Sequence, residues 1–179
     1  LTVTMNSWHD VSPGQNTPSV INTVIEISKH SRMKYELDKP SGMLRLDRVV
    51  HTTNVYPGDY GFMPQTVWDD DDPLDVLVIT DEGVLPNTVA RVRVIGVLRM
   101  IDDGESDDKI LGVYEDDPRY NDTTDIDDVH DHRLREIKHY FETYKDLQDK
   151  EVTVTDIEGY EAGRDAVEKG LRLYDEEYK

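Results

Sequence analysis

The stretch Val89–Ile101 reads VARVRVIGVLRMI and is the longest β-like run in the chain. Apolar and polar side chains alternate from Val89 to Val97, as they do along a strand with one buried face. Five shorter runs have the same character, at residues 19–28, 32–38, 43–50, 75–80 and 109–115. Turns rich in Gly, Pro and Asp separate them. Short, closely spaced strands with such turns predict a β-barrel.

The period of the apolar residues changes after residue 130. Leu134, Ile137, Phe141, Tyr144 and Leu147 follow at three- and four-residue spacing, which predicts an amphipathic helix. Asp127 or Asp128 is the expected N-cap of this helix. A short strand over residues 151–159 and a terminal helix over residues 162–174 complete the chain. We therefore expect one domain, residues 1–179, in which two helices pack on a small barrel and residues 1–18 form an irregular arm.

Acidic side chains outnumber basic ones by 39 to 20, which gives a formal net charge of −19. A disordered acidic chain would be poor in aromatic residues, yet ten Tyr and two Trp accompany the strand and helix patterns. We expect a folded, halophilic protein that works in high salt, because molar salt shortens the Debye length to about 3 Å and screens this repulsion. Folding or activity should then need molar salt. Thermal stability undiminished in millimolar salt without divalent metal would contradict this.

Composition also excludes several classes of protein. The chain has no cysteine, so disulfides, thiol nucleophiles and sulfur-ligated zinc sites are excluded. Residues 1–18 lack the basic start and apolar run of a signal peptide, and no apolar run approaches the ~18 residues that span a bilayer. The expected location is cytoplasmic, with no membrane partner. Nucleic acid is not an expected partner either, because phosphate polymers need clustered Lys and Arg.

Two acidic clusters are the first candidates for chemistry. In Trp68–Asp75, WDDDDPLD, residues two apart point the same way if the chain is extended, so Asp70 and Asp72 share one side. The second cluster, at residues 102–108, ends the run at Val89–Ile101. Clustered carboxylates repel one another unless cations bind them, and hard oxygen ligands suit Mg²⁺ or Mn²⁺. On charge alone, both clusters are better explained as loops of a halophilic surface.

Basic residues inside the ordered runs favour a functional site. Lys34 and Arg48 lie in or beside strand-like runs, and Lys109 directly follows the second acidic cluster. Metal ions together with Lys and Arg around one pocket would neutralise a small, highly charged phosphate. The hydroxyl groups of Tyr56 and Tyr60 could add neutral donors, although each is also typical of a core tyrosine near a turn.

Six sequence blocks, taken in order, resemble those of the soluble family I inorganic pyrophosphatases. They span residues 24–147 and read VIEI, KYELDKPSGMLRLDR, VYPGDYGF, DDDPLDVLV, GVLRMIDDGESDDK and HYFETYKDL. The resemblance implies a mainly β fold, a five-stranded OB-like β-barrel with helices, and Mg²⁺-dependent hydrolysis of pyrophosphate to two phosphates. It also implies several Mg²⁺ ions per active site, with Mn²⁺ as a possible substitute, and a homo-oligomer, commonly a hexamer in prokaryotic relatives. Together with the acidic composition, the resemblance predicts a member of this family from a halophilic prokaryote.

The same resemblance gives roles to individual residues. The implied metal ligands are Asp70, Asp75, Asp102 and Asp107, with Glu26 as an outer metal-associated carboxylate. The implied phosphate contacts are Lys34, Arg48, Tyr56, Lys109, Tyr144 and Lys145. Asp72 is the implied water-activating base, Tyr60 lies near the nucleophile, and Glu36 is a further active-site carboxylate. Asp69 and Asp71 are left as salt-adaptive residues, and Asp71 stands where many relatives carry glycine.

The implied reaction is direct attack by a metal-activated water, since no nucleophilic side chain is indicated. Metal coordination can lower the pKa of water to about 7, so the metal ions dominate and Asp72 mainly accepts and orients the proton. Two rival interpretations are an OB-fold module for single-stranded nucleic acid and an acidic cation-binding protein without turnover. The mixture of carboxylates and cations disfavours the first, and the ordered Lys, Arg and Tyr set is unnecessary for the second.

Overall fold

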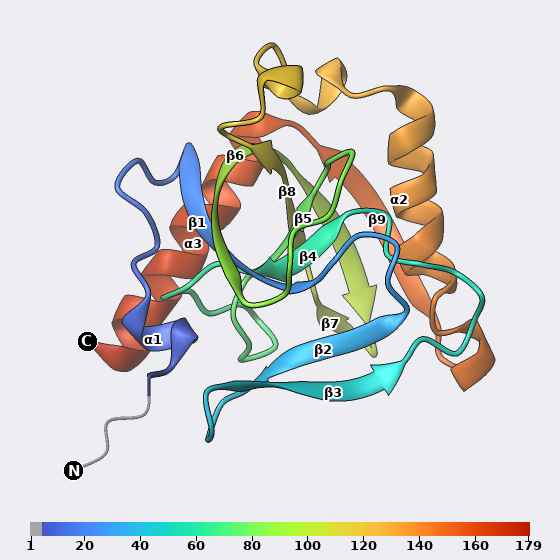
Figure 1. The fold of residues 1–179 in the computed structure, drawn as a ribbon, viewed down its shortest axis with the longest axis horizontal. Helices are drawn as coiled ribbons and strands as arrows, with labels where there is room; N and C mark the ends of the chain where they lie inside the picture. The colour runs from blue at the N-terminus through green and yellow to red at the C-terminus, as the bar shows by residue number, and fades with distance from the viewer. Residues whose placement is uncertain (1–4) are drawn as a thin grey trace.

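The computed structural model describes residues 5–179 and is organised around a closed ring of five strands (Figure 1). In order of hydrogen bonding these are β1 (Val20–Ile27), β4 (Asp59–Phe62), β5 (Asp75–Val78), β8 (Lys109–Tyr114) and β6 (Thr88–Asp102). Strand β6 then pairs back with β1, which closes the ring. The second half of β6 also pairs with β9 (Val152–Glu158) and β7 (Glu105–Ser106). This arrangement confirms the predicted mainly β, five-stranded fold.

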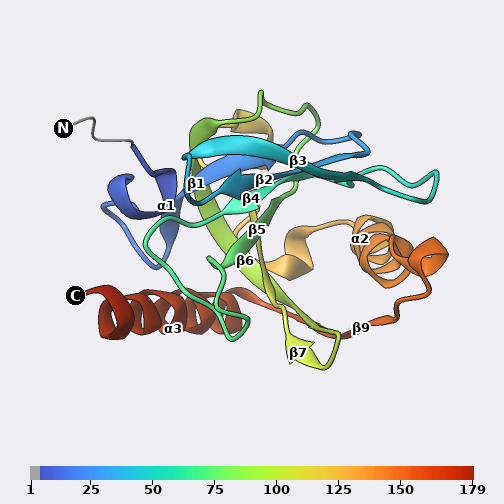
Figure 2. The same cartoon turned by 90° about the horizontal axis from the view of Figure 1, so that it is seen from below.

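Strands β4, β5 and β8 of the ring are buried on both faces. Leu77 of β5 points into one apolar cluster, which α2 (Asp131–Thr143) completes, whereas its neighbours Val76 and Val78 belong to a second cluster. The second cluster includes Val167 of α3 (Tyr160–Tyr178). Figure 2 shows the two helices lying against different parts of the ring. Burial on both faces explains why runs such as Val76–Ile79, VLVI, are continuously apolar rather than alternating.

The prediction of two packed helices is confirmed, but the predicted cap of α2 is wrong. His130 is the N-cap, and its side chain accepts a hydrogen bond from the backbone N–H of His132. Asp128 instead takes part in a capping box with Asp125 at the short 3-10 helix η2 (Ile126–Asp128). Two further 3-10 turns, η1 and η3, lie at Pro118–Tyr120 and Asp146–Gln148.

Strand β4, DYGF, falls in one of the stretches rich in Gly, Pro and Asp that separate the predicted runs, YPGDYG, so the apolar pattern does not predict it. Its glycine marks a close approach between strands rather than a reversal of the chain. A Cβ atom at Gly61 would lie 1.9 Å from the backbone oxygen of Val24 on β1, so only glycine lets β4 pair there. The neighbouring Asp59 is fully buried and accepts hydrogen bonds from the backbone N–H groups of Lys29 and Val84, at 2.7 and 3.0 Å.

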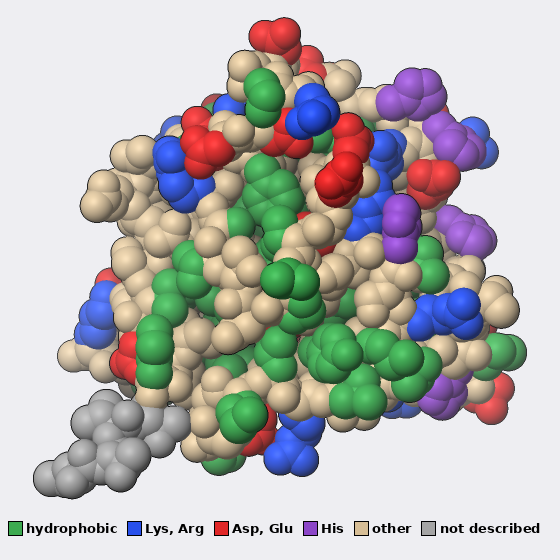
Figure 3. Space-filling model, viewed as in Figure 1, with side chains coloured by type: hydrophobic (Ala, Val, Ile, Leu, Met, Phe, Trp, Pro, Cys, Tyr) green, Lys and Arg blue, Asp and Glu red, His purple; other side chains and the backbone are tan. Residues whose placement is uncertain are grey.

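Strands β2 (Met33–Asp38) and β3 (Met43–Val49) form a separate two-stranded sheet beside the ring (Figures 1 and 2). Its turn is closed by the backbone N–H of Gly42, which donates to the oxygen of Asp38 at 2.8 Å. Apolar side chains gather on the face seen in Figure 3, over this hairpin, and the hairpin's Met43 and Leu46 are exposed. The other side of the hairpin faces the site described below.

The predicted irregular arm, residues 1–18, contains a helical turn. Residues 1–4 lie outside the described residues, and α1 covers Ser7–Asp10. Trp8 of α1 is 3% exposed, and its indole N–H donates to the backbone oxygen of Thr66 at 2.8 Å. The arm is thereby anchored to the body of the protein. That residues 1–179 form one domain stays a prediction.

No helix within residues 5–179 is both long enough and apolar enough to cross a membrane.

Candidate active site

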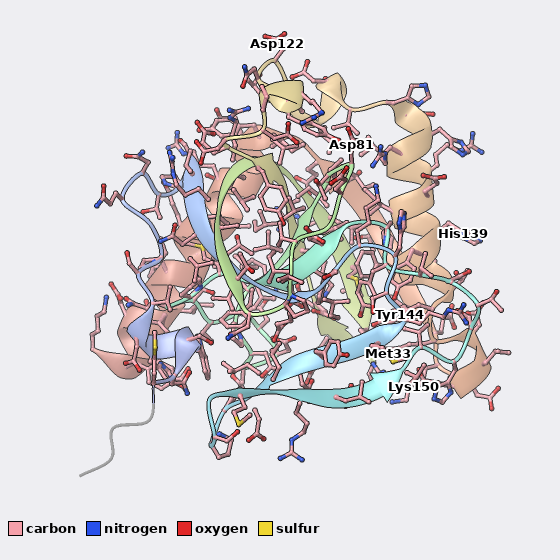
Figure 4. All side chains as sticks on the ribbon, viewed as in Figure 1. Met33, Asp81, Asp122, His139, Tyr144 and Lys150 are labelled. Carbon is pink, nitrogen blue, oxygen red and sulfur yellow. The ribbon has the colours of Figure 1, made fainter. Side chains whose placement is uncertain are left out.

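A cavity of ≈ 530 Å³ lies between the ring and the β2–β3 hairpin. Twelve of the fourteen predicted site residues line it: Glu26, Lys34, Glu36, Arg48, Tyr60, Asp70, Asp72, Asp75, Asp102, Asp107, Tyr144 and Lys145. They come from segments more than a hundred positions apart, so the fold gathers them into one site. In Figure 4, Tyr144 lies at the end of α2 that faces the hairpin, and Met33 marks the start of β2.

The acidic wall is built by a tight turn that we call the aspartate loop, residues 69–72. The N–H of Asp71 donates to the oxygen of Trp68 at 3.0 Å, and the N–H of Trp68 donates to the oxygen of Asp72 at 2.8 Å. The expectation of an extended chain here is therefore wrong. Asp70 and Asp72 nevertheless line the cavity, while Asp69 and Asp71 line a different hollow beside α3. The four aspartates thus lie on two sides, in the pairs that strand alternation predicts, but the turn and not an extended strand places them there.

The turn also explains the conformation of Asp71. Its φ angle is +63°, in the left-handed region that glycine adopts most easily and that Asp and Asn tolerate better than most residues. This agrees with the resemblance, which implies glycine at this position in many members of the family. An extra carboxylate is accommodated there because the side chain is exposed and points away from the cavity.

Two lysines compensate the deeper carboxylates. Lys109 is 2% exposed, and its ammonium lies 2.7 Å from Asp75 and 2.5 Å from Asp107. Lys145 pairs with Asp102 in the same way. Burial disfavours the charge on Lys109, but the two carboxylates outweigh it and raise the pKa of the ammonium above its ordinary value. The side chain of Lys109 lies behind these carboxylates and is not among the residues that line the cavity.

Negative charge in the cavity remains under-compensated. Burial and the neighbouring Asp75 raise the pKa of Glu26 to about 8. Burial, with Asp75 and Asp107, raises the pKa of Asp70 to about 6. Among residues 5–179, eight carboxylates and five Lys or Arg side chains line the cavity. A site of this kind attracts additional cations.

The opposite wall is cationic and belongs to the hairpin. Lys34 and Arg48 are directly paired across β2 and β3, so both side chains emerge at one position along the cavity. Asp47 holds them, at 3.1 Å from the Lys34 ammonium and 3.7 Å from Arg48. Glu36 lies 3.5 Å from the same ammonium. Two positive side chains thus face the aspartate loop across the cavity.

The tyrosines divide into two groups. Tyr60 and Tyr144 line the cavity, and burial raises the pKa of both hydroxyl groups, so each stays a neutral donor. Tyr56 is 1% exposed and lies outside the lining, with its ring centroid 5.3 Å from that of Tyr60 and 4.9 Å from that of Tyr140. In this arrangement Tyr56 supports the wall rather than reaching into the cavity.

Sequence reasoning missed three charged residues that line the cavity: Asp38, Lys39 and Arg45. Lys39 is the most consequential, because its ammonium lies 2.6 Å from the carboxylate of Asp72. The two residues are 33 positions apart and lie in unconnected turns. No local pattern relates them, and the only available signal was the turn sequence KPSG, which places Lys39 near the hairpin tip.

The residues present fit divalent metal ions in charge and in donor type. Asp70, Asp75, Asp102 and Asp107 offer hard oxygen ligands on one side of the cavity. Within residues 5–179, no three His, Asp or Glu side chains converge closely enough to form a ready-made metal cage. The ammonium of Lys109 lies between two of the four carboxylates, so metal binding there requires these ion pairs to rearrange.

Glu26 makes the stability of the metal-free protein depend on pH. Its folded pKa of about 8 exceeds the ordinary value of 4.5, so the folded state holds this proton more tightly than the unfolded state. The free energy of unfolding should therefore fall as pH rises from about 4.5 to about 8, by on the order of 4 kcal/mol from this buried group. Urea unfolding at several pH values with a chelator measures this slope.

Glu26→Gln should flatten that slope, whereas Glu36→Gln on the same cavity should retain it, since the Glu36 side chain is 48% exposed. A slope that is unchanged in Glu26→Gln, or stability that rises with pH in the wild type, would contradict the assignment.

A larger cavity, ≈ 1030 Å³, lies between α2 and residues 53–57. Figure 3 shows histidine, lysine and arginine side chains on the α2 side of the molecule, and His139 and Arg135 line this cavity. None of the fourteen predicted site residues lies there. The smaller cavity is therefore the candidate active site.

A five-strand ring with facing walls of carboxylates and cations defines a hydrolase-type site for a small, highly charged phosphate. The family model described as inorganic pyrophosphatase matches residues 23–175. The chain belongs to the inorganic pyrophosphatase family.

Individual relatives agree with this membership. The chain is 47% identical over 171 residues to soluble inorganic pyrophosphatase 2 of Chlamydomonas reinhardtii, covering 96% of this chain and 89% of that protein. It is 47% identical over 174 residues to soluble inorganic pyrophosphatase 1 of Arabidopsis thaliana, covering 97% and 82%. Among solved structures, the inorganic pyrophosphatase from Thermus thermophilus superposes with a TM-score of 0.91 at 40% identity, covering 94% of this chain and 99% of that one.

Proposed function

We propose that the cavity between the aspartate loop and the β2–β3 hairpin is where this member of the inorganic pyrophosphatase family hydrolyses pyrophosphate to two phosphates. The observation that supports this assignment of the active site is that two oppositely charged walls line one cavity of ≈ 530 Å³. A non-catalytic cation site would not need the Lys34–Arg48 pair, and a nucleic-acid groove would not carry eight carboxylates.

Asp70, Asp75, Asp102 and Asp107 are the proposed metal ligands, with Glu26 behind them. Mg²⁺ bound there supplies positive charge that polarises the phosphoanhydride and makes a bound water more acidic. We propose Mg²⁺ as the working ion, several per site, with Mn²⁺ as a substitute, because both prefer oxygen ligands.

The cationic wall is proposed to bind the substrate. Lys34 and Arg48 face the carboxylates across the cavity, and Lys145 lies beside Tyr144 at its edge. These side chains would stabilise negative charge on the transferred and leaving phosphates. Lys109 and Tyr56, which lie behind the lining, would contact phosphate only after a local rearrangement. Without one, their role is to fix the walls.

Asp72 is the proposed base. Its carboxylate lies at the mouth of the cavity and is 60% exposed, so a water molecule can reach it. Tyr60 offers a neutral hydroxyl group within the same cavity, and Glu36 adds a carboxylate on the hairpin side. The chain has no cysteine, and the resemblance indicates no nucleophilic side chain, so the proposed attack on phosphorus is by water directly.

A single-turnover experiment in ¹⁸O-enriched water tests this proposal. With enzyme in excess over pyrophosphate, direct attack places one solvent oxygen in one of the two phosphates released in the first turnover. Attack by an enzyme carboxylate would instead form an acyl phosphate on the enzyme, which hydroxylamine traps whichever of its bonds water later cleaves. A trapped acyl phosphate, or a first-turnover phosphate without solvent oxygen, would contradict the proposal.

Other properties proposed for this chain depend on the resemblance or on charge. The resemblance leads us to propose a homo-oligomer, specifically a hexamer. The sequence patterns lead us to propose a cytoplasmic location. The relatives named above come from a green alga, a plant and a bacterium, and they do not support a halophilic prokaryotic source. Dependence on salt is proposed from the net charge of −19 alone. Thermal stability measured in millimolar and in molar salt, without divalent metal, tests it.

A further inference from the structure

The hairpin turn reaches across the mouth of the cavity to the aspartate loop through one ion pair. The ammonium of Lys39 lies 2.6 Å from Oδ1 of Asp72. Both residues line the cavity, one from each wall. Within residues 5–179, no other side chain forms a hydrogen bond or ion pair with the Asp72 carboxylate. The orientation of this carboxylate therefore depends on Lys39.

Lys39 is itself held by the N-terminal turn. Its ammonium lies 4.8 Å from the centroid of the Trp8 ring, a cation–π geometry, and its backbone oxygen accepts a hydrogen bond from the Asn6 side chain at 3.1 Å. Trp8 is in turn fixed by its hydrogen bond to Thr66, three positions before the aspartate loop. A continuous chain of contacts thus runs from α1 through Lys39 to Asp72.

The position of the Asp72 carboxylate matters for the proposed chemistry. A general base must lie within hydrogen-bond reach of the proton it accepts, and a misplacement of about 1 Å can lower the rate by about 10²-fold. Asp72 lies in a turn at the protein surface, where its side chain would otherwise be free to rotate. The ion pair with Lys39 restricts this rotation and leaves the second carboxylate oxygen available.

We infer that Lys39 is a positioning residue for Asp72, and that α1 is part of the active-site assembly because Trp8 and Asn6 hold Lys39 in place. The inference rests on the proposed role of Asp72 as the base. It extends the site beyond the residues that the family model matches, 23–175, since Asn6 and Trp8 precede them.

The decisive variant is Lys39→Met, which keeps the length of the side chain and removes its charge. We expect kcat for pyrophosphate to fall about tenfold while KM changes less than threefold, because a positioning residue acts on the reacting geometry rather than on substrate binding. Thermal stability should not change, since exposed ion pairs contribute little to it. Lys39→Arg should restore kcat to within about threefold of the wild type.

Lys169 provides a matched control. Its ammonium lies 4.1 Å from the centroid of the Trp68 ring and 2.7 Å from Asp69, so it is the same kind of pair on the other side of the aspartate loop. It lies on α3 and is not among the residues that line the cavity. Lys169→Met should leave kcat within about twofold of the wild type. An equal loss in both lysine variants would overturn the inference, because it would show a general effect on the loop.

A double-mutant cycle separates this inference from the proposed function. In the Asp72→Asn background, Lys39→Met should lower kcat by less than about twofold further, because the positioned group is already absent. Additive losses, or a rise in KM at constant kcat, would overturn the inference and indicate a direct phosphate contact. If Asp72→Asn is slow but Lys39→Met is not, only the inference fails. If Asp72→Asn retains full kcat, the assignment of the base fails as well.

Discussion

Replacing Asp72 by asparagine is expected to lower kcat by about 10²- to 10⁴-fold, the range that a positioned general base contributes. Asparagine keeps the shape of the side chain and its place in the turn but accepts a proton far less readily. Because the Asp72 side chain is 60% exposed, the free energy of unfolding should change by less than about 0.5 kcal/mol. Phosphate release under saturating pyrophosphate, together with a thermal melt, measures both quantities.

Asp71→Asn is the appropriate control for Asp72→Asn. It removes a carboxylate from the same turn, and asparagine tolerates the positive φ angle of this position. Asp71 points away from the cavity, so kcat should stay within about twofold of the wild type. Asp69 is a less suitable control, because its ion pair with Lys169 connects the loop to α3. Equal losses in the Asp71 and Asp72 variants would show that the loop's overall charge matters rather than one base.

Lys109→Met is expected to cause the largest change in stability. The ammonium is almost fully buried between Asp75 and Asp107, so its removal leaves two carboxylates without a counter-charge. Breaking a buried pair by removing one partner typically costs about 3–5 kcal/mol. Urea unfolding in the presence of a chelator should show a loss of this size. Saturating Mg²⁺ should restore much of it, because metal ions would then compensate the same carboxylates.

The control for Lys109→Met is Lys138→Met on α2. Lys138 is half exposed and lies 3.8 Å from Glu142, a surface pair expected to contribute less than about 0.5 kcal/mol. The free energy of unfolding of the Lys138→Met variant should depend on Mg²⁺ no more than that of the wild type. If Lys109→Met were destabilised equally with and without Mg²⁺, the lysine would be a packing element and not the counter-charge that metal ions replace.

The loss of stability expected in Lys109→Met and its recovery in Mg²⁺ describe one property of the cavity, the balance of charge around its carboxylates. In the structure, Lys109 and Lys145 act as internal counter-ions for Asp75, Asp107 and Asp102. This compensation is incomplete, because eight carboxylates and five Lys or Arg side chains of the described residues line the cavity. We therefore expect the site to favour divalent cations, because one such ion brings the charge of two ammonium groups to a single position among the carboxylates.

Much of the fold could be predicted from the period of the apolar residues. The long alternating run became β6, the strand that closes the ring, and the change of period after residue 130 became α2. Strand β4 could not be predicted in this way, because its glycine is required by close packing against β1, a partner more than thirty positions away. The cap of α2 was missed because aspartates that resemble caps close a separate 3-10 turn instead.

The candidate site was predictable as a set of residues but not as a geometry. The sequence blocks named fourteen residues, and twelve of them line one cavity. Burial of Tyr56 and Lys109 behind the walls depends on how tyrosine rings and carboxylates pack, which no linear pattern contains. The contact between Lys39 and Asp72 likewise depends on the distance between two turns that only the tertiary fold brings together.

Phosphate release from pyrophosphate, measured with and without Mg²⁺ in molar KCl, tests the central claim most directly. We predict two phosphates per pyrophosphate with Mg²⁺, no turnover after chelation, and full recovery when Mg²⁺ is restored. Monovalent cations at molar concentration should not replace the divalent ion, because a cluster of four carboxylates binds the higher charge more strongly. Turnover that persists after chelation, or a folded wild-type protein that releases no phosphate with Mg²⁺, would contradict the account.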